Sequence, residues 1–104
     1  MQIEILYFPD CPNHAAAVRR VRDVMAREGL AAEIREITVE DEHTGEELGF
    51  LGSPTIRVNG LDIEPTERGA KFAGLACRLY PGGLPSEEMI RTALHEALAK
   101  EGQA

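Results

Sequence analysis

A strand, an amphipathic helix and a second strand follow one another from Gln2 to Val39, and this order constrains the fold more than any other feature. Gln2 to Phe8 alternates between polar and apolar residues and then becomes apolar on both faces, which predicts a central strand. From Pro12 to Glu28, apolar residues recur at steps of three and four, which predicts a helix that stops at Gly29. Ala32 to Val39 alternates again. Strand, helix and strand in this order predict a right-handed crossover with parallel strands.

The middle of the chain predicts a short helix and a hairpin. Glu40 to Gly52 is acidic and contains a short helical segment that we expect to close at Gly52. Thr55 to Val58 and Leu61 to Glu64 are strand-like, and they are separated by Asn59-Gly60, which tolerates the positive φ angles of a type I′ turn. These two runs therefore predict an antiparallel hairpin.

The last third combines a long irregular segment with a final helix. Pro65 to Leu84 has no clear period, and a compact domain normally uses such a length functionally or folds part of it locally. Within it, Phe72, Leu75, Ala76 and Leu79 have helical spacing, which allows one or two helical turns. Ser86 can cap the last helix, whose apolar stripe consists of Met89, Ile90, Ala93, Leu94, Ala97 and Leu98.

Together these elements predict an α/β fold with the order β-α-β-α-β-β-α. The expected packing is a three-layer sandwich in which helices cover both faces of a four-stranded mixed sheet. A chain of 104 residues has the size of one domain, so residues 1–104 are expected to form a single domain. With 43% hydrophobic and 28% charged residues, the composition is that of an ordinary globular protein.

Charge and hydropathy exclude several classes of partner. The formal net charge of −7 argues against binding to a nucleic-acid backbone, which requires clustered Lys and Arg. No apolar run approaches the ~20 residues that cross a bilayer, so no membrane partner is expected. The amino terminus has no basic targeting segment, which favours the cytoplasm, where thiols stay reduced. The sequence does not indicate an oligomeric state.

Three sequence motifs carry a resemblance to a known family. They are YFPDCPNH at residues 7–14, GFLGSPT at residues 49–55 and GLACRLY at residues 74–80. From Ile3 to Leu98 the chain resembles the thioredoxin fold. The three motifs are similar to those of a family of small thioredoxin-like proteins, some of which are described as selenoproteins or labelled alkylmercury lyases.

The resemblance implies a site around Cys11. In thioredoxin-like proteins a C-x-x-C motif opens the first helix, and a cis-proline faces it from the start of a later strand; Cys11 and Pro54 match these positions. The resemblance also implies that Pro12, Ser53, Pro54 and Thr55 shape the substrate-binding surface. This chain departs from the family at His14, which stands where the second cysteine is usual. A disulfide within the motif is therefore excluded.

The residues around Cys11 support a nucleophilic role on physical grounds. A helix amino terminus exposes unpaired N–H groups and carries partial positive charge, which favours a thiolate over a thiol. His14 can act as a base toward the Cys11 thiol, or stabilise the thiolate when it is protonated. Asp10 acts in the opposite direction, because a neighbouring carboxylate disfavours a thiolate. The sequence leaves this balance open.

Cys77 is a candidate second thiol. In the predicted topology the fourth strand runs back toward Cys11, so the loop that begins at Pro65 emerges at the same end of the sheet. Cys77 lies in that loop and can act as a resolving thiol if it reaches Cys11. A disulfide requires Cα atoms within about 7 Å of each other. Equally, Cys77 can be a small core residue.

Three classes of function fit these features. The first is a thiol-disulfide oxidoreductase without a cofactor, which acts on a protein or small-molecule disulfide through Cys11 and has Cys77 as its candidate resolving thiol. The alternative is soft-metal or organomercurial handling by Cys11, His14 and Cys77. The third is an interaction module that uses an edge strand or the apolar tip Gly49-Phe50-Leu51.

Overall fold

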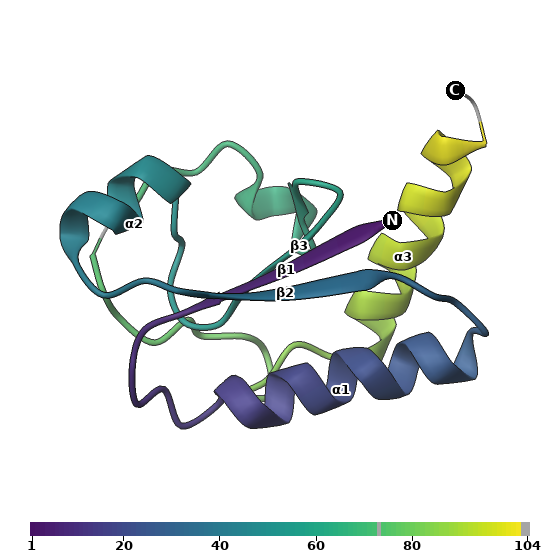
Figure 1. The fold of residues 1–104 in the computed structure, drawn as a ribbon, viewed down its shortest axis with the longest axis horizontal. Helices are drawn as coiled ribbons and strands as arrows, with labels where there is room; N and C mark the ends of the chain where they lie inside the picture. Colours follow the sequence, from purple (N-terminus) through teal and green to yellow (C-terminus); the bar gives the residue numbers. More distant parts are fainter. Residues whose placement is uncertain (73, 103–104) are drawn as a thin grey trace.

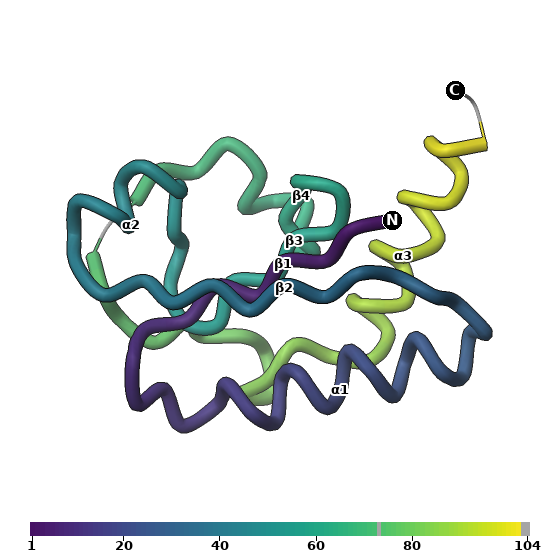
Figure 2. The backbone as a smooth tube through the Cα atoms, in the orientation of Figure 1, coloured from purple at the N-terminus to yellow at the C-terminus, as the bar shows by residue number. Residues whose placement is uncertain are grey.

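The computed structural model describes residues 1–72 and 74–102, and a mixed β-sheet forms its centre. In this part of the chain the sheet has four strands, β1 (Gln2–Tyr7), β2 (Glu33–Thr38), β3 (Thr55–Val58) and β4 (Leu61–Asp62). Their order is β2-β1-β3-β4, with β2 parallel and β3 antiparallel to β1 (Figures 1 and 2). The predicted α/β class with a four-stranded mixed sheet is confirmed.

Three α-helices connect and cover these strands in the described residues. They are α1 (His14–Arg27), α2 (Glu42–Leu48) and α3 (Glu87–Glu101), and a short 3-10 helix, η1 (Pro65–Glu67), follows β4. The arrangement is compatible with a thioredoxin-like α/β fold. No helix in the described part of the chain combines the length and the apolar character that a membrane span requires.

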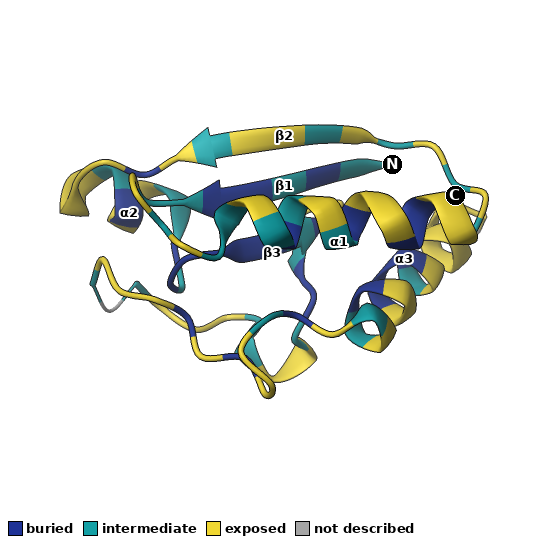
Figure 3. Ribbon diagram, turned by 90° about the horizontal axis from the view of Figure 1, so that it is seen from below, coloured by how far each residue is buried: buried dark blue, intermediate teal, exposed yellow. Residues whose placement is uncertain are grey.

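Helices α1 and α3 pack on the same face of the sheet. Ile3 and Ile5 of β1 point toward this face together with Ile56 of β3, because residues two apart in a strand share a face. The helices contribute the other half of the core, and their buried sides face the sheet (Figure 3). The buried helical residues are Ala17, Val21, Val24 and Met25 of α1 and Ile90, Ala93, Leu94 and Ala97 of α3.

A smaller apolar cluster covers part of the opposite face. Leu6, Val39 and Phe50 are its buried centre, and Phe72 packs against it from the long loop. Phe50 is completely buried. The tip at residues 49–51, which the sequence offered as a surface or as core, therefore contributes Phe50 to the core.

Some predicted element ends agree with the structure, and others do not. Asn59 and Gly60 both have positive φ, as the predicted hairpin turn requires. The Ser86 hydroxyl accepts a hydrogen bond from the Met89 N–H at 3.0 Å and caps α3. Helix α2, however, ends at Gly49, which has φ of 65°, and not at Gly52 as predicted. The sequence offered two glycines, and the left-handed cap formed at the first one.

The prediction of helical turns between Phe72 and Leu79 is wrong for the residues described there. After η1 the chain is irregular, and residue 77 forms an isolated β-bridge with Ser53. Gly69 and Gly74 have φ of 89° and 133°, values that a helix does not allow. The segment therefore returns along the sheet in an extended form (Figure 2).

We predict that Leu94→Ala destabilises the protein far more than Leu98→Ala on the same helix. Leu94 is completely buried between the sheet and α1, whereas Leu98 is 41% exposed. Both substitutions remove the same atoms, but only Leu94→Ala leaves a cavity in the core. Leu94→Ala should therefore lower the free energy of unfolding by about 2–5 kcal/mol. Urea unfolding of both variants measures this difference. Equal losses would contradict the described core.

Candidate functional site

Cys11 lies directly after β1, in a tight turn that the local sequence favours. Its N–H donates a hydrogen bond to the Phe8 carbonyl at 3.3 Å. Pro9 occupies the second position of this turn, and Asp10 has φ of 65° at the third. Proline followed by a residue with positive φ is typical of a type II turn, and aspartate tolerates that conformation better than most residues. The turn leaves Cys11 half-buried at the end of the sheet.

Helix α1 begins two residues later than predicted, so Pro12 lies in the connecting turn. The first helical residue is His14, and Asn13 is the cap. The His14 N–H donates to the Cys11 carbonyl at 3.4 Å, which closes a second turn around Pro12 and Asn13. No acidic residue lies in the first turn of α1. The first turn of α1 therefore adds no negative charge to the partial positive charge at this end of the helix, while Asp10 directly precedes Cys11.

The peptide bond between Ser53 and Pro54 is cis, as the resemblance implied. The side chains of Ser53, Pro54 and Thr55 are buried, so these residues pack inside the protein beneath the surface of the site. The Thr55 hydroxyl donates to the Gly52 carbonyl at 2.5 Å and accepts from the Leu51 N–H at 3.2 Å. These bonds fix the conformation of residues 51–55, which lead into β3.

Cys77 is held next to Ser53 by backbone hydrogen bonds. The Ser53 N–H donates to the Ala76 carbonyl at 2.9 Å, and the Arg78 N–H donates to the Ser53 carbonyl at 3.0 Å. The Ser53 hydroxyl accepts from the Phe8 N–H at 3.3 Å, at the start of the turn that carries Cys11. Ser53 therefore links the segments that carry the two cysteines. Both are free thiols, and Cys77 is exposed.

Two further residues, Arg78 and Tyr80, anchor the Cys77 segment, and neither was a predicted site residue. The Tyr80 hydroxyl donates to the Pro54 carbonyl at 2.8 Å, and the Arg78 guanidinium is bound by Asp62 and Glu64. Burial raises the pKa of the Tyr80 phenol, against the opposing effect of Arg78. The alternation in GLACRLY could have indicated these two residues, because in an extended segment it places Arg78 and Tyr80 on one side and Cys77 on the other.

Gly52 allows the close approach of this segment. It has φ of 112°, and a Cβ atom there would lie 2.9 Å from Cβ of Arg78. A contact this short cannot form without displacement, and the atom concerned is close to the backbone. Gly52, which was predicted to end a helix, therefore makes room for the irregular segment that carries Cys77.

The structure places the His14 ring against β1 and β2. The imidazole stacks on Tyr7, with ring centroids 3.6 Å apart and planes 11° apart. Its Nε2 atom lies 2.7 Å from Oε1 of Glu36. Among the hydrogen bonds of the described residues, none joins this ring to the Cys11 sulfur. His14 therefore fastens the start of α1 to the sheet, and one ring nitrogen is already occupied.

The described residues do not assemble a metal centre. No group of three or more His, Cys, Asp or Glu side chains in residues 1–72 and 74–102 is placed to hold a metal ion. Cys11, His14 and Cys77, the predicted ligands of a soft metal, are thus not brought together as one ligand set.

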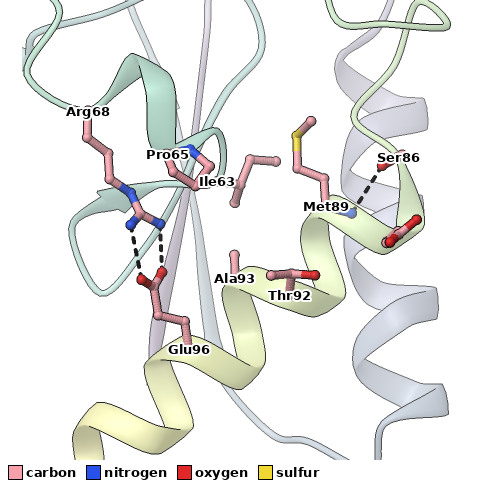
Figure 4. Close-up of a pocket in the computed structure, with 9 residues that line it drawn as sticks. Ile63, Pro65, Arg68, Ser86, Met89, Thr92, Ala93 and Glu96 are labelled. Atoms are coloured by element: carbon pink, nitrogen blue, oxygen red, sulfur yellow. Dashed lines mark hydrogen bonds and ion pairs between the residues drawn. The ribbon is translucent and has the colours of Figure 1, made fainter.

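Two cavities differ in their relation to the thiols. One of about 400 Å³ lies between η1 and α3, where Arg68 and Glu96 form a two-bond ion pair across its edge (Figure 4). Its lining contains neither cysteine. The other, of about 210 Å³, is lined by Cys77 together with Leu51, Gly52, Glu67, Ala70, Lys71, Gly74 and Ala76. An open space is therefore available beside the exposed thiol.

No protein-family model matches this chain, and no match was found among curated proteins. The family resemblance of the three motifs therefore stays a prediction.

We predict that Gly52→Ala destabilises the protein more than Gly74→Ala. Both glycines have strongly positive φ, at 112° and 133°, so both substitutions strain the backbone. Only the Cβ at position 52 would meet another atom within 4 Å, and that atom belongs to Arg78. We expect an additional loss of about 1–3 kcal/mol for Gly52→Ala in urea unfolding. If the two variants lose equal stability, the close packing at Gly52 is refuted.

Proposed function

We propose that this protein catalyses thiol-disulfide exchange, with Cys11 as the nucleophile and Cys77 as the resolving thiol. One observation carries the proposal: Ser53 is hydrogen-bonded both to the segment that contains Cys77 and to Phe8, where the turn with Cys11 begins. Two free cysteines that are distant in sequence are thereby tied to one buried residue. A structural role for either thiol would not require this arrangement.

In the first step the Cys11 thiolate attacks one sulfur of a substrate disulfide. The amino end of α1 favours the negative charge, and Asn13 adds no carboxylate at the cap. The new bond joins Cys11 to one half of the substrate. The substrate's own disulfide bond breaks, and the other half leaves as a thiolate that takes up a proton from water.

In the second step Cys77 resolves this mixed disulfide. Its thiol loses a proton to solvent and attacks the Cys11 sulfur, so that a Cys11–Cys77 bond forms and the second half of the substrate leaves as a thiolate. The two cysteines are oxidised and the substrate is reduced. A thiol reductant of the kind abundant in the proposed cytoplasmic location then returns both cysteines to the thiol form.

The surface around Cys77 favours a substrate with apolar groups near its sulfur atoms. Leu79 is 91% exposed, and Leu75 is also exposed, two residues to either side of Cys77 along the segment. When a partner covers large apolar side chains of this kind, their removal from water lowers the free energy of the complex. We therefore infer that the substrate is a disulfide of a protein or of an apolar small molecule.

We predict distinct products when the reduced protein reacts with a chromogenic aromatic disulfide. The wild-type protein should release the aromatic thiol twice and end with an internal disulfide and no adduct, because Cys77 expels the first adduct. Cys77→Ser should react at the same initial rate, release the thiol once and keep one adduct. Cys11→Ser should lose the fast phase. Absorbance and intact-protein mass follow all three reactions.

The same measurements include a control variant and the outcomes that would contradict the proposed function. Ala76→Ser changes a neighbouring exposed residue without removing a thiol, and it should behave as the wild-type protein does. A wild-type protein that accumulates two aromatic adducts would show that the cysteines react independently. That result, or an undiminished fast phase in Cys11→Ser, would overturn the proposed function.

A further inference from the structure

The Arg78 side chain is almost completely buried, although the residue before it, Cys77, is exposed. It is only 5% exposed and forms two bonds to Asp62, from Nη1 to Oδ2 at 2.7 Å and from Nη2 to Oδ1 at 2.8 Å. Its Nη2 also donates to Oε1 of Glu64 at 2.7 Å. The guanidinium carbon lies 4.7 Å from the centre of the Tyr80 ring. All these partners lie on the side of the segment opposite Cys77.

The carboxylate that receives Arg78 is fixed by the sheet. Asp62 belongs to β4, where it pairs with Arg57 of β3. Its Oδ1 atom accepts a further hydrogen bond from the Glu64 N–H at 2.8 Å, and its carbonyl accepts from Nε of Arg68 at 2.8 Å. The Asp62 side chain is 4% exposed. The acceptor therefore keeps its position independently of the loop that Arg78 brings to it.

The ion pair and the backbone bridge act on the same residue. Arg78 donates its N–H to the carbonyl of Ser53, whose hydroxyl is bonded to Phe8, while its side chain is bound to Asp62 of β4. Burial would lower the pKa of the Arg78 guanidinium, but the hydrogen bonds and charges of its partners hold that pKa above its ordinary value. A residue fixed at both its backbone and its side chain also limits the movement of the residue before it, Cys77.

We propose that Arg78 is a positioning residue for Cys77, and that its buried ion pair with Asp62 sets the effective concentration of the Cys77 thiol at Cys11. This inference rests on the proposed function, because it concerns the resolving step. An intramolecular thiol gains its advantage from restricted geometry, so release of the segment lowers the probability of encounter. Burying an ion pair costs desolvation free energy and is a weak means of adding stability, which agrees with a positional role.

The test compares the equilibrium of the Cys11–Cys77 disulfide in three proteins. Wild type, Arg78→Met and the control Arg27→Met are equilibrated with reduced and oxidised glutathione, quenched in acid, and analysed by mass. Arg27 also forms an ion pair, with Glu87, which joins α1 to α3 and includes no residue of β4 or of the Cys77 segment. We expect Arg78→Met to lower the effective concentration at least about tenfold and Arg27→Met to leave it within about twofold.

A second readout separates positioning from general damage. Cys11 alkylation by iodoacetamide should proceed at the same rate in all three proteins, because the turn at Cys11 does not depend on Arg78. If Arg78→Met fails to fold, the double variant Arg78→Met with Asp62→Leu removes the unpaired buried charge and should show the same tenfold loss. Arg78→Lys, which keeps the charge but not the two-bond geometry, should recover part of the effective concentration.

The outcomes distinguish this inference from the proposed function. A wild-type protein that forms no Cys11–Cys77 disulfide in any glutathione ratio would overturn both. Formation in the wild type with an equal effective concentration in a folded Arg78 variant would overturn only the role of Arg78. A parallel loss in Arg27→Met would do the same, because it would show a general effect of removing an ion pair.

Discussion

The hydrogen bonds of Ser53 hold the two cysteine-bearing segments at one end of the sheet. Ser53 binds Ala76 and Arg78 through its backbone and Phe8 through its side chain, and it directly precedes cis-Pro54. Because Ser53 is completely buried, the loss of any of these bonds would leave a polar group of Ser53 without a partner. The geometry of the candidate site therefore depends on a residue that is itself completely buried.

The charges around Arg78 explain how a loop of irregular sequence keeps a defined position. A guanidinium with two carboxylate partners tolerates little displacement, since loss of either bond leaves charge in a medium that solvates it poorly. Tyr80 adds a second fixed point on the Pro54 carbonyl. Between these anchors the opposite side of the segment stays free, and it carries Cys77 and Leu79 to the surface. Rigidity on one side and exposure on the other suit a thiol that must meet both a partner cysteine and a substrate.

Regular periodicity made the sheet and the helices predictable, whereas the loop was not. The strand and helix patterns are local, and so is the turn at Asn59-Gly60. The bridge between Ser53 and Cys77 joins residues that no period connects, and the spacing of Leu75 and Leu79 suggested a helix where the chain is extended. His14 stacks on Tyr7, at the other end of the same motif, and its Nε2 lies at Glu36 of β2, and no local period indicates either contact. Long-range hydrogen bonds decided the position of the Cys77 segment and the contact between His14 and Glu36.

Amide hydrogen exchange reports on the two backbone hydrogen bonds that hold Cys77 next to Ser53. We expect the Arg78 and Ser53 amides to be protected to a degree comparable with the amides of β3, since each donates to a carbonyl across the bridge. Exchange of both amides at the rate of an unstructured peptide, with β3 still protected, would contradict this expectation. The segment that carries Cys77 would then lack the fixed position on which the proposed chemistry depends.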